Sequence, residues 1–360
     1  MSKFYSLTIK NIERETEDCV CLTLNMPENL KSVFKYQAGQ YLTFRKLFEN
    51  KDIRRSYSLC SSPLDNEWKV AVKKIDNGLF STFANGEIKP GDTIEVMPPM
   101  GSFVIKDDIN TKLNIVAFAS GSGITPILSF IKTVLKSNQE STFTLFYGNK
   151  HSNSIIFKES LIKLEQLYSN RLKIYYLFSR EKQNNELLNG RLNAEKSQEL
   201  SINHFDKNNT DGFFLCGPEE MIIQISKQLE NLGVDKNKIH FELFTTPTEA
   251  FKTLNPTDEN SDPNLPINAK VTIILDDNSI EFDLRSNAES ILDAAMKHGA
   301  DLPFACKGGV CCTCKAKVTH GEVKMDMNYG LDPDEVENGY VLTCQSHPIS
   351  AEVTIDFDTY

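Results

Sequence analysis

Hydrophobic and polar residues alternate in short runs over the first hundred residues of the chain. These runs cover residues 4–9, 19–24, 41–44, 56–60, 69–75 and 93–97, and turn-forming residues separate them. A period of two is typical of half-buried strands, and no long helical period interrupts it. We therefore expect an antiparallel β-barrel over residues 1–108.

The pattern changes after residue 112. Apolar, strand-like runs at residues 114–119, 143–147, 173–178 and 212–216 alternate with helix-like stretches at 126–136, 157–168 and 219–232. Such alternation indicates a parallel sheet covered by helices. We expect this α/β domain over residues 109–245.

A third unit is expected at the C-terminal end. Residues 270–275 and 281–284 suit a hairpin around residues 276–278, and residues 290–297 suit a helix that Gly299 ends. The preceding residues 246–266 are rich in proline and have no apolar period, which favours a semi-extended linker over a surface loop. The C-terminal domain would then span residues 267–360.

The charge of the chain is concentrated in this last unit. The whole chain has a net charge of −10, and residues 267–360 hold 7 basic and 16 acidic residues. A negative balance disfavours nucleic acid as a partner. No apolar run approaches the ~18 residues that span a bilayer, and the N-terminus lacks the apolar core of an export signal. We expect a cytoplasmic protein whose nine cysteines are thiols or metal ligands.

Three cysteines have the spacing C-x4-C-x2-C, and a fourth follows after 29 intervening residues: Cys306, Cys311, Cys314 and Cys344. This is the ligand spacing of a plant-type [2Fe–2S] cluster. A zinc site usually needs two C-x2-C pairs, and only one is present. Gly308 and Gly309 would let backbone amides approach the cluster. The spacing excludes Cys312 from the ligand set.

The barrel segment carries the motif Arg55-Ser56-Tyr57-Ser58. It offers a guanidinium for a phosphate, an aromatic plane for a ring system and a hydroxyl for a heteroatom. Alone it would equally suit an exposed strand. It gains weight from the turn at residues 78–81, which leads into a helix start with free N–H groups for a phosphate.

The α/β segment carries a strand, a glycine turn and a helix at residues 114–126, ending in G-S-G-I-T-P. Such a turn lets a pyrophosphate approach the backbone and the helix N-terminus, although a purely structural turn has the same form. Arg180, after the third strand, would accommodate the extra phosphate of NADPH, whereas the adjacent Glu181 would favour NADH. A C-G-P turn closes the fourth strand, at the sheet edge where ligands bind.

Taken in order, these motifs resemble the ferredoxin–NADP⁺ reductase superfamily fused to a C-terminal plant-type ferredoxin, over essentially the whole chain. The resemblance implies an FAD-binding barrel, an α/β NAD(P) domain and a β-grasp ferredoxin domain. Within it, residues 305–318, 321–334 and 339–345 are similar to reductase subunits of phenylacetyl-CoA epoxidase, a bacterial multicomponent di-iron oxygenase.

The resemblance also implies roles for single residues. FAD would contact Arg55, Ser56, Tyr57, Ser58, Val72, Gly78 and Ser81. NADPH would contact Gly121, Ser122, Gly123, Thr125, Ser179, Arg180, Cys216, Gly217 and Met221. Ser58, near flavin N5, and Cys216, near the nicotinamide, are the catalytic candidates. Phe244 is the nearest counterpart of the terminal aromatic residue of plant-type reductases.

The expected function is electron transfer from NADPH through FAD and the cluster to a di-iron oxygenase in phenylacetate degradation. Two alternatives remain open at this point. The acceptor could be another oxygenase or metalloprotein, or the chain could be a redox sensor without turnover. The acidic C-terminal unit leads us to expect a basic docking patch on the oxygenase.

Overall fold

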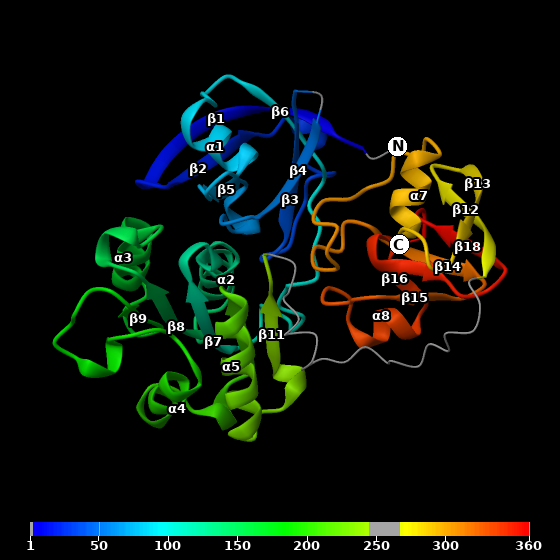
Figure 1. The fold of residues 1–360 in the computed structure, drawn as a ribbon. Coiled ribbons are helices and arrows are strands. Elements are labelled where there is room, and N and C mark those ends of the chain that lie inside the picture. The colour runs from blue at the N-terminus through cyan, green and yellow to red at the C-terminus, as the bar shows by residue number, and fades with distance from the viewer. Residues whose placement is uncertain (1–2, 50, 245–266, 360) are drawn as a thin grey trace.

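The computed structural model describes residues 3–49, 51–244 and 267–359, which form three successive units, each built on a β-sheet (Figure 1). The linker predicted at residues 246–266 lies outside the described residues. Within the described ranges, no helix is long and apolar enough to cross a membrane. In Figure 1 the first two units lie against each other, and the C-terminal unit lies beside them.

The first sheet has six antiparallel strands in the order β4-β3-β6-β1-β2-β5. Its elements are β1 (Tyr5–Thr16), β2 (Cys19–Asn25), β3 (Tyr41–Phe48), β4 (Lys51–Ser58), β5 (Trp68–Lys73), β6 (Thr93–Val96) and the helix α1 (Leu79–Gly86). A bridge between Leu59 and Val70 brings the two edges of the sheet together, so that it curls around a core containing Phe44 and Phe80. The expected antiparallel architecture is confirmed.

The second sheet has five parallel strands in the order β11-β10-β7-β8-β9. The strands are β7 (Asn114–Ser120), β8 (Thr142–Asn149), β9 (Leu172–Phe178), β10 (Gly212–Cys216) and β11 (Ile239–Glu242), and the helices are α2 (Ile124–Ser137), α3 (Lys158–Leu167), α4 (Ala194–Asn203) and α5 (Glu219–Asn231). The expected α/β architecture is confirmed. The pattern did not predict α4, which buries only Ser197 and Leu200, or the short β11. Helix α2 also begins before the expected start at Pro126.

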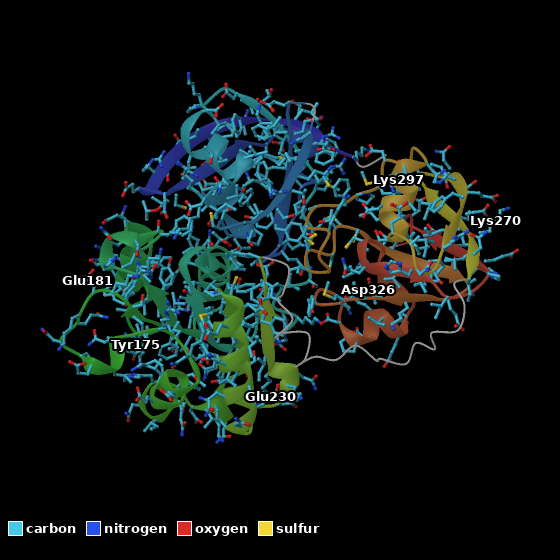
Figure 2. All side chains as sticks on the ribbon, viewed as in Figure 1. Tyr175, Glu181, Glu230, Lys270, Lys297 and Asp326 are labelled. Atoms are coloured by element: carbon cyan, nitrogen blue, oxygen red, sulfur yellow. The ribbon has the colours of Figure 1, made fainter. Side chains whose placement is uncertain are left out.

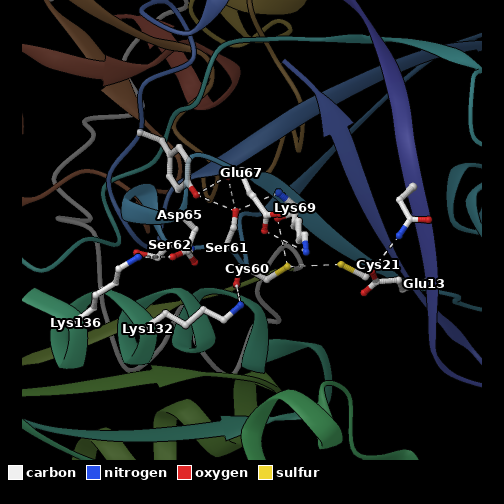
Figure 3. A network of polar contacts seen from close by, with 12 residues as sticks. Glu13, Cys21, Cys60, Ser61, Ser62, Asp65, Glu67, Lys69, Lys132 and Lys136 are labelled. Carbon is white, nitrogen blue, oxygen red and sulfur yellow. Dashed lines mark hydrogen bonds and ion pairs between the residues drawn. The ribbon is translucent and has the colours of Figure 1, made fainter. Parts of the chain in front are cut away.

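Polar contacts join the barrel to α2 (Figure 3). Ser129 Oγ of α2 donates to the Ser61 carbonyl at 2.6 Å, and Lys136 Nζ of the same helix lies 2.9 Å from Asp65 Oδ1. Most of α2 is buried between its own sheet and the barrel, and its buried Ser129 and Thr133 make hydrogen bonds to the barrel. The first two units therefore form one packed body.

The third unit has a mixed five-stranded sheet in the order β13-β12-β18-β14-β16 and a small β15-β17 pair. Its elements are β12 (Asn268–Leu275), β13 (Asn278–Arg285), α7 (Ile291–Lys297), β14 (Lys315–His320), β15 (Val323–Met325), α8 (Pro333–Glu337), β16 (Tyr340–Leu342), β17 (Ser346–Pro348) and β18 (Glu352–Asp356). Asp276 and Asp277 form the predicted hairpin turn, both with positive φ, as a two-residue turn requires. The central strands β12 and β18 run parallel, and the expected C-terminal ferredoxin-type architecture is confirmed.

Candidate functional site

All three units contribute to one cavity of about 320 Å³. Its walls come from β3 and β4, from the segment that ends the α/β unit, and from residues 305–314, which we refer to as the cysteine loop. The lining residues are Tyr41, Arg54, Arg55, Ser56, Ser58, Glu242, Leu243, Phe244, Ala305, Cys306, Val310 and Cys311. We refer to it as the shared cavity. It brings residues expected to bind a flavin next to residues expected to bind a cluster.

Strand β4 supplies the barrel side of the shared cavity. Arg55 is exposed and Ser58 is buried, and both line the cavity together with Ser56. The ring of Tyr57 is not part of this lining: it lies 5.6 Å from the Phe80 ring and 5.9 Å from the Phe44 ring. The cavity thus joins a guanidinium to hydroxyl groups, a donor set that suits the phosphate and heteroatoms of a flavin nucleotide. The role of Tyr57 at the isoalloxazine stays a prediction.

The other flavin candidates lie around α1. The carbonyl of Val72 accepts a hydrogen bond from Asn85 Nδ2 at 2.9 Å. Ser81 Oγ donates to the Gly78 carbonyl at 3.2 Å and accepts from the Ile75 amide at the same distance. A Cβ on Gly78 would lie 2.4 Å from Ser81 Oγ, so the turn needs glycine there. These contacts build the N-terminus of α1, the part of the turn that the sequence analysis assigned to a phosphate.

Glu242 is a candidate that the sequence analysis missed. It ends β11, and its Oε2 accepts a hydrogen bond from Ser58 Oγ at 3.1 Å and lies 4.0 Å from Cys216 Sγ. Burial raises the pKa of Glu242 to about 8, although the Ser58 hydroxyl works in the opposite direction. The two catalytic candidates, Ser58 and Cys216, therefore meet at one carboxyl that is protonated at neutral pH. The available signal was its place in Phe241-Glu242-Leu243-Phe244, next to the aromatic candidate.

Cys216 and Phe244 flank this carboxyl differently. Cys216 is fully buried at the end of β10, and burial raises the pKa of its thiol, which therefore remains protonated. Phe244 lines the shared cavity with 44% of its surface exposed. Its position is consistent with the expected aromatic cover, and that role stays a prediction.

A second cavity of about 420 Å³ opens at the carboxyl ends of the parallel strands. We refer to it as the nucleotide cavity. Its lining comprises Lys73, Ser120, Gly121, Gly148, Asn149, Lys150, Ser154, Ser179, Arg180, Gly190, Arg191, Leu192, Asn193, Pro218, Glu220, Met221 and Gln224. The structure thus brings together Gly121, Ser179, Arg180 and Met221 from the predicted set. This edge is where ligands bind in open α/β sheets.

Glycines shape the floor of the nucleotide cavity. Gly121 has φ +55, a left-handed conformation that favours glycine. A Cβ on Gly123 would lie 2.0 Å from the Cys216 carbonyl oxygen, and one on Gly217 would lie 2.7 Å from Met221 Cε. The two turns consequently touch, which holds the G-S-G loop against the end of β10. Within the first turn, Thr125 Oγ1 donates to the Ser122 carbonyl at 3.0 Å, so these two residues brace the loop.

The charges around Arg180 favour an anionic ligand. Arg180 and Arg191 are both exposed and both line the nucleotide cavity, as does Lys150. Glu181 is engaged elsewhere: its Oε2 accepts from the amide of Ser152 at 2.7 Å and from the Ser152 hydroxyl at 2.9 Å. Figure 2 shows Glu181 on the side of the α/β unit away from the C-terminal unit. The backbone hydrogen bond from Ser152 lowers the pKa of Glu181, which secures its charge outside the cavity lining.

The cysteine loop presents its thiols in two pairs, Cys306 with Cys311 and Cys314 with Cys344. The amides of Gly308 and Cys311 point to Cys306 Sγ at 3.3 and 3.4 Å. A [2Fe–2S] cluster takes two thiolates on each iron, and amide donors stabilise its added negative charge. This donor set fits the cluster.

Two further residues, Gly309 and Gln345, fix the conformation of the cysteine loop. Gly309 has φ +74, and a Cβ there would lie 3.0 Å from the Met327 carbonyl oxygen, so the loop requires glycine. Gln345 Nε2 donates to the Lys307 carbonyl at 3.1 Å and lies 3.7 Å from Cys344 Sγ. The loop and the more distant ligand are therefore tied together by a side chain that the sequence analysis did not single out.

Cys312 is oriented differently from the four candidate ligands. It has φ +52 and is buried, and its Sγ lies so close to Gly330 that a Cβ on that glycine would be 2.3 Å from the sulfur. Burial raises the pKa of the Cys312 thiol to about 12. A buried, protonated thiol packed on Gly330 agrees with its expected exclusion from the ligand set.

The C-terminal unit is attached to the other two by polar contacts. Lys106 Nζ lies 2.7 Å from Asp332 Oδ2, and Ser102 Oγ donates to the Gly330 carbonyl at 2.8 Å. A buried contact belongs to Arg54, whose side chain is only 3% exposed and which donates to the Leu302 carbonyl at 3.2 Å. These contacts hold the cysteine loop over the shared cavity.

Comparison with known proteins agrees with this architecture. The oxidoreductase FAD-binding domain matches residues 6–105, the oxidoreductase NAD-binding domain matches residues 118–227, and the 2Fe-2S iron-sulfur cluster binding domain matches residues 273–348. The chain is 42% identical over 359 residues to one of the subunits of 1,2-phenylacetyl-CoA epoxidase from Escherichia coli K12, covering 99% of both proteins.

More distant relatives share the same order of units. The ferredoxin reductase component of 3-ketosteroid-9-alpha-monooxygenase from Rhodococcus rhodochrous is 30% identical, covering 99% of this chain and 97% of that protein. The solved structure of phthalate dioxygenase reductase shares the fold over 98% of both chains, with a TM-score of 0.59 at 23% identity. The chain therefore belongs to the family of NAD(P)H-dependent flavin oxidoreductases in which FAD-binding and NAD-binding domains are fused to a C-terminal [2Fe–2S] ferredoxin domain.

Proposed function

We propose that this chain is the NADPH-dependent reductase component of a di-iron oxygenase, phenylacetyl-CoA epoxidase or a close relative. The observation that carries this proposal is the shared cavity, which Arg55 and Ser58 of the barrel line together with Cys306 and Cys311. A flavin site and a cluster site with a common wall suit transfer of electrons from one group to the other. A non-turnover sensor would not need this arrangement.

The proposed division of labour follows the units: residues 1–108 hold FAD, 109–245 hold NADPH, and 267–360 hold the cluster after a linker at 246–266. When bound, FAD and the [2Fe–2S] cluster would supply the redox chemistry, which converts the two-electron donation of NADPH into single-electron transfers. The chain binds them, sets their spacing and excludes water. Arg55 would hold the FAD phosphate, and the four cysteines would hold the irons.

Ser58 and Glu242 form a hydrogen-bonded pair at the shared cavity, in which the Glu242 carboxyl would hold a proton. The Ser58 hydroxyl donates to Glu242, and the raised pKa of about 8 keeps that carboxyl protonated at neutral pH. The Glu242 carboxyl can therefore hold a proton while its Oε2 accepts from Ser58, without placing a negative charge beside the flavin site. Cys216, held as a thiol by burial, would leave space for the nicotinamide at the end of β10.

The preference for NADPH is part of the proposal. Support comes from Arg180, Arg191 and Lys150, whose positive charges line the nucleotide cavity. Glu181, the residue that would favour NADH, is held by Ser152 instead. A 2′-phosphate gains from bidentate guanidinium contacts that a ribose hydroxyl cannot use equally.

The acceptor is proposed from the relatives. The phenylacetyl-CoA epoxidase component from Escherichia coli is similar to this chain over its whole length at 42% identity. The 30% identity with a 3-ketosteroid monooxygenase component supports a second candidate, the reductase of another multicomponent oxygenase. Both candidates predict the same fold and cofactors and differ only in the partner.

A reconstituted assay tests the proposal. The purified chain, loaded with FAD and iron–sulfur cluster, is mixed with NADPH and the di-iron subunits of phenylacetyl-CoA epoxidase, and epoxide formation is followed. Product formation that requires this chain supports the epoxidase assignment. Rapid reduction of ferricyanide by NADPH without epoxide formation would support the second candidate, and failure to oxidise NADPH with either acceptor would refute the reductase function.

A further inference from the structure

Tyr41 joins the shared cavity to the cysteine loop. It is the first residue of β3, it lines the shared cavity and it is 4% exposed. Its hydroxyl donates to the Cys311 carbonyl and lies 3.0 Å from Thr313 Oγ1. Thr313, which is fully buried, in turn donates to Cys311 Sγ at 3.2 Å. A continuous chain of polar contacts thus leads from the barrel to the sulfur of a candidate cluster ligand.

The backbone of Tyr41 is held from both sides. It lies opposite Ser58 in the β3–β4 ladder, and on its other side it exchanges two backbone hydrogen bonds with Met100, at 2.9 and 3.0 Å. The ring passes directly over Gly101, where a Cβ would lie 2.9 Å from Tyr41 Cε1. The hydroxyl therefore has little freedom to move away from the cysteine loop.

The number of protons makes Tyr41 more than a packing residue. The two hydroxyls carry one proton each, yet three contacts connect Tyr41, Thr313 and Cys311. If Tyr41 donates to Thr313, the threonine proton is directed to the sulfur. If Tyr41 donates to the Cys311 carbonyl, it fixes the loop, and Thr313 must divide its single proton between oxygen and sulfur. A carbonyl oxygen can only accept, so the structure has the second arrangement, in which the Tyr41 hydroxyl oxygen competes with Cys311 Sγ for the Thr313 proton.

We propose that Tyr41 is a positioning residue for electron transfer, which holds the cysteine loop on the shared cavity and limits how strongly Thr313 donates to Cys311 Sγ. The inference rests on the proposed function for its biological role, since it concerns the step between FAD and the cluster. A hydrogen bond to a ligand sulfur stabilises the reduced cluster and raises its reduction potential. Tyr41 thereby sets both the contact between the two sites and the driving force across it.

The test is the Tyr41→Phe variant, which removes only the hydroxyl. Thr313 can then give its whole proton to Cys311 Sγ, so at a fixed solution potential we expect the ratio of reduced to oxidised cluster to rise roughly three- to tenfold, the effect of one hydrogen bond. This equals an increase in the midpoint potential of about 30–60 mV for one electron. The cluster's EPR spectrum should also change, and stopped-flow cluster reduction should slow more than flavin reduction in the same sample.

Three companion variants separate coupling from general damage. Tyr36→Phe is the matched control, because Tyr36 is also buried in the barrel, with its hydroxyl donating to the Glu67 carbonyl at 2.9 Å, away from the cysteine loop. It should leave the potential and the EPR spectrum unchanged. Thr313→Val should lower the potential, because it removes the donor to Cys311 Sγ, and the double variant should match Thr313→Val, because Tyr41 acts on the sulfur only through Thr313. Thr313→Ser, which keeps the hydroxyl, should have the same potential as the unaltered chain.

The readouts also separate this inference from the proposed function. Potential and EPR spectra are measured on the intact chain titrated with dithionite, so they test Tyr41 whether or not NADPH is the donor. An unchanged potential and spectrum in Tyr41→Phe would overturn the inference, as would fully additive effects of the two substitutions. The reductase function itself would fail separately, if NADPH did not reduce the flavin of the unaltered chain.

Discussion

Replacement of Arg54 by methionine should loosen the cysteine loop from the barrel. The Arg54 side chain is only 3% exposed, and three of its contacts cross to the C-terminal unit: the Leu302 carbonyl, the Asp301 carboxylate and the Phe304 ring. A fourth, with Asp52, lies within β4. Methionine keeps an apolar stem over the ring and removes the charge, so the substitution isolates the guanidinium.

The size of the effect follows from the three crossing contacts. A charged donor to the Leu302 carbonyl is worth roughly 1.5–3 kcal/mol, and a guanidinium 4.1 Å from the Phe304 ring centroid contributes roughly 1 kcal/mol. The Asp301 pair, at 3.4 Å with a carboxylate 39% exposed, adds little, at most roughly 0.5 kcal/mol. We expect the free energy of opening the loop to fall by about 3 kcal/mol, a factor of roughly a hundred in the opening equilibrium.

Hydrogen exchange followed by mass spectrometry measures this opening directly. Peptides from residues 301–311 should lose about two orders of magnitude of protection in Arg54→Met if exchange occurs through loop opening. Arg45→Met is the matched control: Arg45 lies opposite Arg54 in the β3–β4 ladder and makes a two-bond pair with Glu95. It should lower protection in the barrel and leave the loop almost unchanged. Equal loss of protection in the loop for both variants would refute the assignment of Arg54 as its anchor.

Three further predictions concern the two cavities and the cluster. Arg180→Ala should raise the KM for NADPH and lower kcat/KM by an amount equivalent to roughly 1.5–3 kcal/mol, while the kinetics with NADH change little. An equal loss with both nucleotides would show that Arg180 does not contact the phosphate. Because the pKa of Glu242 is raised to about 8, its charge appears only above that pH, so the rate of flavin reduction should fall as the pH rises through about 8, and Glu242→Gln should flatten that profile in stopped-flow measurements. Cys312→Ser should keep the visible absorption of the cluster, whereas Cys311→Ser should weaken or bleach it, and similar losses in both would contradict the ligand assignment.

The fold could be predicted wherever one segment carries its own periodicity. The parallel strands β7, β8, β9 and β10 are short apolar runs between helices, and all four were expected within a residue or two. Helix α4 was not predicted because its polar sequence buries only two residues. Strand β11 was not predicted because it is short and half-buried. Both lie at the margins of the α/β unit, where the pattern of burial is weakest.

The site was predictable where its chemistry is local in sequence. The cysteine spacing and the glycine turns identified the cluster loop and the nucleotide cavity, because their residues lie close together along the chain. Glu242 could not be identified in this way, because its candidate role depends on a hydrogen bond from Ser58, which lies 184 positions earlier. Tyr41 and Arg54 act on residues more than 240 positions away. Only the packed structure gives such residues their partners.

Part of the negative charge of the C-terminal unit is neutralised by ion pairs within the chain. Residues 267–360 carry an excess of nine acidic groups, which led us to expect a basic patch on the partner. Several of those acids are engaged within the chain, among them Asp332 with Lys106, Glu335 with Lys315, and Asp301 with Arg54. Two of these pairs bind the unit to the reductase portion, beside the cavity that both share. Part of the acidic surface thus serves docking inside the molecule, and the proposed steering of an oxygenase would depend on the acids that remain facing outward.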